Sequence, residues 1–139
     1  MSSGWSALLT LQRATHATLQ ALAAQLTDLD LSASEINALA NLADGRSRTV
    51  SELAAAAGSR PSTLTSVLDR LERRGLIRRG PASGDRRAVL IELTSSGRRA
   101  AATIRRAVTD LEQRALGGLP ADTIAGLRAG LQALAQVSG

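Results

Sequence analysis

The sequence predicts a mainly α-helical fold with one small β-hairpin, and three observations support this fold class. Aliphatic residues recur at three- and four-residue steps over most of the 139 residues. The period changes to two over roughly residues 76–93 and then returns to the helical one. Capping boxes and glycines mark the ends of the segments. Because a chain of this length buries one core, we expect a single domain over residues 1–139.

The first two helices are predicted from a leucine stripe and a capping box. The stripe covers residues 5–26, and a short break follows it. Ser32 and Glu35 then have the spacing at which each side chain accepts a hydrogen bond from the other residue's backbone N–H. The second helix is expected to run from this box to about Asp44, since Gly45 can end it.

Two consecutive helices joined by a tight turn are predicted next. Thr49 and Glu52 form a second capping box, and Gly58 permits the left-handed turn that ends the helix. The following helix, about 60–74, is expected to be capped by Ser59 and has a proline in its first turn. The residues expected to fill the angle between the two helices are Leu53, Leu64 and Val67. The arrangement is typical of a helix-turn-helix, although an ordinary helical hairpin has the same pattern.

A hairpin and two further helices complete the expected order. Residues 76–80 and 88–93 are predicted strands, and the stretch PASGDRR is expected to be the loop between them. Thr94 can cap a long helix that runs to about Leu116. Two glycines interrupt it, and a final helix follows Pro120. The expected order is therefore four helices, a hairpin and two helices.

The basic residues are concentrated in the middle of the chain. All 17 are arginine, and the formal net charge is +5. Residues 45–106 hold 14 arginines against five acids, a net +9, whereas the remainder carries −4. A uniformly soluble surface would spread this charge more evenly. The concentration therefore favours a partner that is a polyanion.

The composition excludes several classes of function. The chain has no cysteine and one histidine, His16, so disulfides, thiol redox chemistry and a metal site are not expected. It has no paired histidine and carboxylate and no glycine-rich phosphate loop, so we expect neither an enzyme nor a cofactor. No apolar run approaches the roughly 20 residues of a membrane span, and the start MSSGWSALL has no basic region. A cytoplasmic protein without membrane contact is expected.

The outer face of the predicted helix 60–74 carries polar and basic side chains. Small hydroxyls near a helix N-terminus can enter a major groove and reach base edges, and arginines further along can reach phosphates. The candidates for base readout are Arg60, Ser62, Thr63, Thr65 and Ser66. The candidates for contact with the DNA backbone are Arg70, Arg73 and Arg74. A solvated helix end would also account for the last two arginines.

The predicted hairpin loop carries Asp85, Arg86 and Arg87. Taken alone, this cluster is compatible with an ordinary solvated loop. A loop that follows a helix seated in a major groove would, however, reach the neighbouring minor groove, where the negative potential favours guanidinium groups. Phosphate would repel Asp85, so its expected task is to orient an arginine. The loop is therefore interpreted as a wing.

These residues together resemble the MarR family of bacterial winged helix-turn-helix regulators. The family pattern Asp-x-Arg-x-x-x-(Val/Ile)-x-Leu-Thr is matched by Asp85, Arg87, Ile91, Leu93 and Thr94, with Gly97 after it. The stretch 62–79, STLTSVLDRLERRGLIRR, is similar to the family's recognition helix running into the first wing strand. The resemblance covers the whole chain in element order and residues 50–98 in motif detail.

The resemblance implies a winged helix-turn-helix over residues 32–96 and dimerisation through helices in 5–26 and 97–137. It implies a homodimer on a palindromic site in double-stranded DNA, with Arg87 in the minor groove and Asp85 supporting it. The leucine stripes of the terminal helices favour a dimer independently, because the central motif is too small to cover them all. Two recognition helices about 34 Å apart would meet successive major grooves.

The function expected from the sequence is therefore that of a transcriptional regulator, most consistent with a repressor that occludes a promoter. The resemblance also implies a small-molecule effector, although the chain has no Phe or Tyr to stack on an aromatic one. An architectural DNA-binding protein without strong sequence preference is the alternative. A further alternative is a winged helix that binds protein instead of DNA. Arg87 and the arginine-rich helix argue against this alternative.

Overall fold

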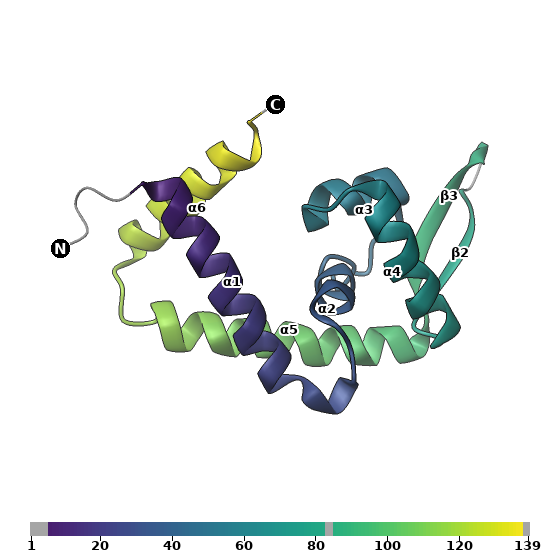
Figure 1. Cartoon of the computed structure of the whole chain (residues 1–139), viewed down its shortest axis with the longest axis horizontal. Helices are drawn as coiled ribbons and strands as arrows, with labels where there is room; N and C mark the ends of the chain where they lie inside the picture. The colour runs from purple at the N-terminus through teal and green to yellow at the C-terminus, as the bar shows by residue number, and fades with distance from the viewer. Residues whose placement is uncertain (1–5, 83–84, 138–139) are drawn as a thin grey trace. The chain divides into compact units, whose positions relative to one another are not determined.

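The computed structural model of the chain describes residues 6–82 and 85–137, with side chains given outside residues 82–88. Two compact units are present, Met1–Val108 and Thr109–Gly139. The elements, in chain order (Figure 1), are α1 (Ala7–Gln25), the 3₁₀ turn η1 (Thr27–Leu29), α2 (Ala33–Ala40), β1 (Arg48–Thr49), α3 (Val50–Ala57), α4 (Pro61–Arg73), β2 (Ile77–Ala82), β3 (Asp85–Leu93), α5 (Ser95–Leu116) and α6 (Ala121–Ala135). The predicted fold class is confirmed.

The core of the first unit lies where α2, α3, α4 and the sheet meet the first half of α5. Its fully buried large side chains are Leu39, Leu42, Leu53, Leu64, Leu68, Leu71, Ile77, Ile91 and Ile104. Four of these nine belong to the two helices of the predicted helix-turn-helix, which accounts for the close packing of α3 against α4. The prediction that Leu53, Leu64 and Val67 fill that angle is confirmed, since none of them is more than 4% exposed.

Both predicted capping boxes are present. The Ser32 hydroxyl accepts from the Glu35 backbone N–H at 3.2 Å, and the Glu35 carboxylate accepts from the Ser32 N–H at 2.9 Å. Thr49 and Glu52 make the same pair of bonds at 3.1 and 2.9 Å. Each box satisfies two backbone donors that the first helical turn would otherwise leave without a partner.

The second helix is shorter than the sequence predicts. It ends at Ala40 rather than near Asp44. Asn41, its C-cap, turns its side chain back and donates to the Asn37 carbonyl at 2.8 Å. The next turn is closed by tighter bonds, from Leu42 N–H to the Leu39 carbonyl at 3.0 Å and from Gly45 N–H to the Leu42 carbonyl at 3.1 Å. Asparagine competes for backbone groups in this way, so the α-helix stops one turn early.

The turn between α3 and α4 depends on one glycine. Gly58 has φ +66°, a left-handed conformation that L side chains rarely adopt. The backbone N–H of Ser59 then bonds to the Ala54 carbonyl at 2.9 Å. The prediction that Ser59 caps α4 is wrong: Arg60 is the N-cap, without a side-chain bond, and Pro61 is the first helical residue. Proline at that position removes one of the donors that a cap would serve.

The wing is a three-stranded antiparallel sheet in the order β1, β3, β2. The sequence did not indicate β1, which has two residues and pairs Arg48 with Ile91. The two hairpin strands are longer than predicted, because pairing continues to Ala82 and Asp85. Asp85, Arg86 and Arg87 therefore belong to β3 by their backbone rather than to a loop. The added ladder bonds satisfy peptide groups that a seven-residue loop would leave to water.

The start of α5 is fixed against the end of α4. The Thr94 hydroxyl accepts from the Gly97 N–H at 3.0 Å, as predicted for its cap, and donates to the Gly75 carbonyl at 2.6 Å. Gly97 packs so closely on this junction that a Cβ there would lie 1.8 Å from the Leu76 carbonyl oxygen. The hairpin, α4 and α5 thus meet at one tightly packed point.

The second unit contains the end of α5 and all of α6. The predicted break after Leu116 and the restart at Pro120, which is the N-cap of α6, are confirmed. No residue of α6 is buried. Its exposed large apolar side chains include Leu127 and Leu131, at 43% and 37% exposure.

Candidate nucleic-acid interface

The two faces of α4 differ sharply in character. The inner face consists of Leu64, Val67, Leu68 and Leu71, all buried. Of the residues predicted to contact DNA, the eight in and beside α4 all lie on the exposed face or the ends of the helix: Arg60, Ser62, Thr63, Thr65, Ser66, Arg70, Arg73 and Arg74. Burial of the apolar stripe against the core therefore presents the polar side chains outward as one surface.

The four hydroxyls of this face differ in what they already bind. Thr65 donates to the Pro61 carbonyl at 2.9 Å, and Ser66 donates to the Thr63 carbonyl at 3.2 Å. The hydroxyls of Ser62 and Thr63, both in the first turn, make no hydrogen bond to any described residue. Ser62 and Thr63 can thus both donate to and accept from a ligand, whereas Thr65 and Ser66 keep mainly their acceptor capacity.

The three arginines at the C-terminal half of α4 are not equivalent. Arg74 donates to two backbone carbonyls that follow α1, those of Asp30 at 2.5 Å and Leu29 at 3.0 Å. Asp30 has a left-handed backbone, φ 52°, and ends the η1 turn. Arg74 therefore fastens this turn to the end of α4, a contact that the sequence did not indicate. Arg70 and Arg73 are exposed in the last turns of the helix.

The α4 helix lies beside the β2–β3 hairpin (Figure 1), and one arginine of β2 bridges them. Arg79 Nη2 lies 2.6 Å from both Asp69 Oδ1 and Glu72 Oε1. Hydrogen bonds to the carboxylates of Glu72 and then Asp69 raise the pKa of Arg79. Sequence reasoning missed this contact. The sequence feature that could have indicated it is strand alternation, because alternation places Arg79 on the same side of its strand as the apolar Ile77.

The neighbouring arginine makes its contact within the hairpin. Arg78 Nε donates to Glu92 Oε1 at 3.1 Å across the β2–β3 pair. The Ser47 hydroxyl donates to the other oxygen of Glu92 at 3.3 Å. The bond from Arg78 is the main reason that the pKa of Glu92 lies below its ordinary value. Both exposed partners remain near the surface, so this pair contributes little to stability.

The predicted wing-tip residues are placed only in part. Asp85 pairs with Ala82 in the sheet, and Arg86 and Arg87 follow it in β3. The side chains of these three residues lie outside the described ones, as do Ser83 and Gly84 altogether. Their roles at a minor groove therefore stay predictions.

An ion pair fixes the corner between α2 and β1. Asp44 accepts from both terminal nitrogens of Arg48, at 2.9 and 2.8 Å, and from the Arg46 backbone N–H at 3.0 Å. These bonds, that of the Arg48 side chain first, hold the pKa of Asp44 well below its ordinary value of 3.8. Because β1 pairs with β3, the corner supports the base of the wing.

The low pKa of Asp44 predicts how its substitution should depend on pH. A carboxyl whose pKa is lowered on folding stabilises the fold above its unfolded-state pKa, and the stabilisation is lost as the pH falls toward the folded value. We expect Asp44→Asn to lower the melting temperature at pH 7, and the difference from the wild type to shrink once the pH falls below about 4. Thermal unfolding at pH 7, 5 and 3 measures this; a difference that is constant over that range would contradict the assignment.

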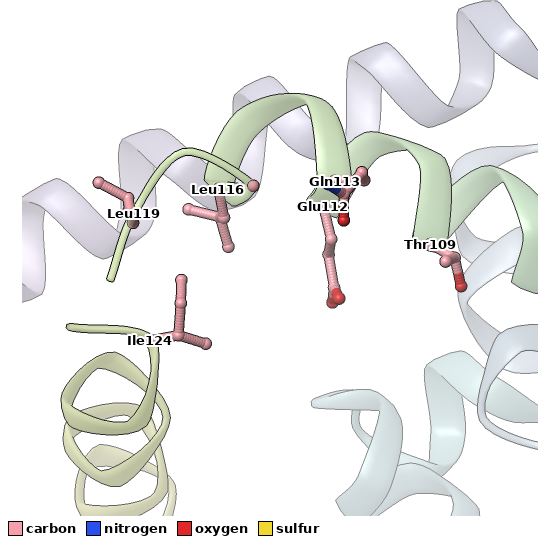
Figure 2. A pocket seen from close by; sticks show the side chains of 7 residues that line it. Thr109, Glu112, Gln113, Leu116, Leu119 and Ile124 are labelled. Atoms are coloured by element: carbon pink, nitrogen blue, oxygen red, sulfur yellow. The ribbon is translucent and has the colours of Figure 1, made fainter. Parts of the chain in front are cut away.

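Cavities occur in each unit. In the first unit, one of about 240 Å³ lies between the turn that follows α2, β3 and α5, and its lining is Ala43, Asp44, Gly45, Leu93, Arg98, Ala101, Ala102 and Arg105. In the second unit, one of about 280 Å³ lies at the bend between α5 and α6, where Leu116 and Ile124 face one another (Figure 2). Among the described residues no helix is long and apolar enough to cross a membrane. The same residues contain no cluster of three or more potential metal ligands.

Comparison with known proteins finds the same fold and motif. Residues 31–89 match the model of the MarR family. The HTH-type transcriptional regulator PecS of Dickeya dadantii is 64% identical over 36 residues, which are 26% of this chain and 22% of PecS. The uncharacterized HTH-type transcriptional regulator YfiV of Bacillus subtilis is 34% identical over 71 residues, 51% of this chain and 44% of YfiV. The matched segments thus span less than half the length of either curated relative.

A solved structure extends the likeness to nearly the whole chain. CouR from Rhodococcus jostii RHA1, whose crystal structure holds p-coumaroyl-CoA, has a TM-score of 0.84 and 27% identity. The match covers 94% of this chain and 92% of CouR. The stretch 31–89, which contains the helix-turn-helix and part of the wing, thus matches the MarR family, and the chain as a whole shares the fold of CouR.

Proposed function

We propose that this protein is a transcriptional regulator that binds double-stranded DNA as a homodimer. Helix α4 enters a major groove at a palindromic operator, the wing approaches the adjacent minor groove, and the bound dimer represses by covering the promoter. The observation that carries the proposal is the division of α4 into a buried leucine face and an exposed hydroxyl and arginine face, within the arginine-rich middle of the chain.

The free hydroxyls suggest how the base contacts are distributed. Ser62 and Thr63 lie in the first turn of α4 and have all their donors and acceptors available, so they are the best suited to read base edges. Arg60 precedes that turn and can reach a base or a phosphate. Arg70 and Arg73 lie further along the helix and suit phosphates, which fix orientation but carry no sequence information.

The uncovered terminal helices support the homodimer. No residue of α1 is buried within the chain, and its Leu8 and Leu9 are each 49% exposed. In the second unit Leu119, Leu127 and Val137 are exposed as well. Apolar side chains left open along whole helices are typical of surfaces that a second copy covers.

An effector site is supported by the cavity between the turn at residues 43–45, β3 and α5. Alanines and Leu93 form its apolar part, while Arg98 and Arg105 border it. This combination suits a small organic acid, with the carboxylate near an arginine. CouR, by comparison, is bound to p-coumaroyl-CoA. No aromatic side chain lines the cavity, so stacking would not contribute to binding.

Replacing Arg87 with alanine tests the wing. The substitution is expected to cost about 1–3 kcal/mol of operator binding, because a guanidinium in a narrow minor groove is lost, and to leave the dimer intact. Titration of a labelled operator fragment measures the affinity, and analytical ultracentrifugation checks the dimer. If the affinity does not change, the role assigned to the wing is wrong.

Footprinting tests the function as a whole. Purified protein added to the region upstream of its own gene should protect a palindromic segment whose two half-sites lie about one helical turn apart. The protection should weaken steeply as salt is raised, because arginines that bind phosphates release counterions. A uniform pattern of cleavage at all protein concentrations would contradict the proposal.

A further inference from the structure

Arg79 occupies a particular place on the wing. Cross-strand pairing joins Ile77 to Leu93 and Arg79 to Ile91, so these four residues share one face of the hairpin. Ile77, Ile91 and Leu93 are buried in the core. The next pair toward the tip on this face, Pro81 and Val89, is exposed. Arg79 therefore sits where the hairpin leaves the core.

At this position Arg79 contacts both acids of α4. Its Nη2 lies 2.6 Å from Asp69 Oδ1 and from Glu72 Oε1, and its Nε donates to Glu72 at 3.2 Å. The Arg79 side chain is 26% exposed, whereas those of Asp69 and Glu72 are 51% and 41% exposed. The guanidinium is thus less exposed than the carboxylates, and its Nε and Nη2 donors bond to the acids of α4.

The charges on α4 explain what this contact accomplishes. Asp69 and Glu72 are the only acids of a helix whose outer face would approach phosphates. Carboxylates left uncompensated there would oppose binding, because like charges across an interface are costly. One arginine held between two carboxylates compensates one of their two negative charges and connects the wing to the helix by three hydrogen bonds.

We propose that Arg79 is a positioning residue for DNA recognition, which locks the wing to α4 through Asp69 and Glu72 and does not itself contact DNA. Recognition through two grooves requires the helix and the wing to keep a fixed relation. Among the described side chains, Arg79 supplies the hydrogen bonds that join them beyond the core. This inference rests on the proposed function, and it distinguishes Arg79 from the arginines assigned to bases and phosphates.

The adjacent Arg78 provides a matched control. Arg78→Gln and Arg79→Gln each remove one positive charge from neighbouring positions of β2. Among the side chains that the structure describes, however, Arg78 pairs only with Glu92, which belongs to the same hairpin. The quantity to measure is the ratio of affinities for the operator and for bulk DNA. We expect Arg79→Gln to lower this ratio about tenfold, while Arg78→Gln weakens both affinities together and keeps the ratio. Equal ratios for the two variants would overturn the proposal.

Removing the acids instead separates positioning from direct contact. The double variant Asp69→Asn/Glu72→Gln lacks two negative charges of the wild type, so its affinity for bulk DNA should rise. If Arg79 positions the wing, the operator-to-bulk ratio of this variant should nevertheless fall about tenfold. An operator affinity that rises with an unchanged or higher ratio would show that the freed Arg79 binds DNA itself, and the proposal would fail.

Hydrogen–deuterium exchange of the DNA-free protein makes the test independent of the proposed function. Amides of β2 should exchange faster in Arg79→Gln and in the double variant than in Arg78→Gln, because the contact with α4 is lost only in the first two. If the wild-type protein showed no preference for the operator over bulk DNA, the proposed function would be contradicted. The exchange data would still decide whether Arg79 locks the wing to α4. Equal exchange in Arg78→Gln and Arg79→Gln would overturn it.

Discussion

Replacing Gly97 with alanine is expected to lower the free energy of unfolding by about 2–3 kcal/mol, although alanine is the better helix former. A Cβ at this position would lie 1.8 Å from the Leu76 carbonyl oxygen and 2.9 Å from its carbon. Both are backbone atoms, so no side-chain rotation relieves the overlap. The junction of α4, β2 and α5 would have to separate, and Thr94 would be displaced from its bonds to Gly75 and Gly97.

Gly126→Ala is the matched control for Gly97→Ala. Gly126 lies inside α6 with an ordinary helical backbone, and a Cβ added there would meet no atom within 4 Å. At this position the same substitution should stabilise the protein by about 0.5–1 kcal/mol. Urea unfolding at one fixed protein concentration compares the two variants. If Gly97→Ala proves as stable as Gly126→Ala, the close packing at the start of α5 is not as described.

The second large effect is expected from Leu68→Ala, which should lower the free energy of unfolding by about 2–5 kcal/mol. Leu68 is fully buried at the centre of α4's inner face and packs in the cluster that includes Leu39 and Leu53. Its truncation leaves a cavity in a region where α4 packs against α2, α3 and β2, so little relaxation can fill it. The Leu68→Ala variant should also lose operator binding, because the orientation of α4 depends on the packing of Leu68.

Ser66→Ala on the opposite face of the same helix is the control for Leu68→Ala. Ser66 is exposed, and its hydroxyl bonds only to the Thr63 carbonyl of its own helix. Its replacement should change the free energy of unfolding by less than about 0.5 kcal/mol. Thermal and urea unfolding distinguish the two. A Leu68→Ala variant that unfolds like the wild type would mean that α4 does not bury its leucine face.

Local sequence patterns were sufficient to predict most elements of this fold. The two capping boxes, the left-handed Gly58 and the cap at Thr94 depend on residues within four positions of one another, so their geometry follows from spacing alone. The early end of α2 is also local, but it arises from an asparagine pair that competes with the helix, which the hydrophobic period does not reveal.

Contacts between distant segments were the part that could not be predicted. The β1 strand has two residues and exists only because β3 pairs with it. The hydrogen bonds from Arg74 to the carbonyls of Leu29 and Asp30 join residues that are 45 and 44 positions apart in the sequence. Arg79 was likewise counted only as part of a positive field, because the sequence does not show that its donors are directed at two acids on another element. The net charge of a segment can indicate a polyanionic partner, but only the structure shows which contact each arginine makes.

The proposed regulator must recognise a particular duplex sequence through the hydroxyl-lined face of α4, with the wing beside it. The most direct measurement is a competition at fixed salt between the segment protected upstream of the protein's own gene and bulk DNA of equal length. The account predicts a preference for the protected segment of about 10³-fold or more. Equal affinity for the two DNAs would contradict it and would favour a DNA-binding protein without sequence preference.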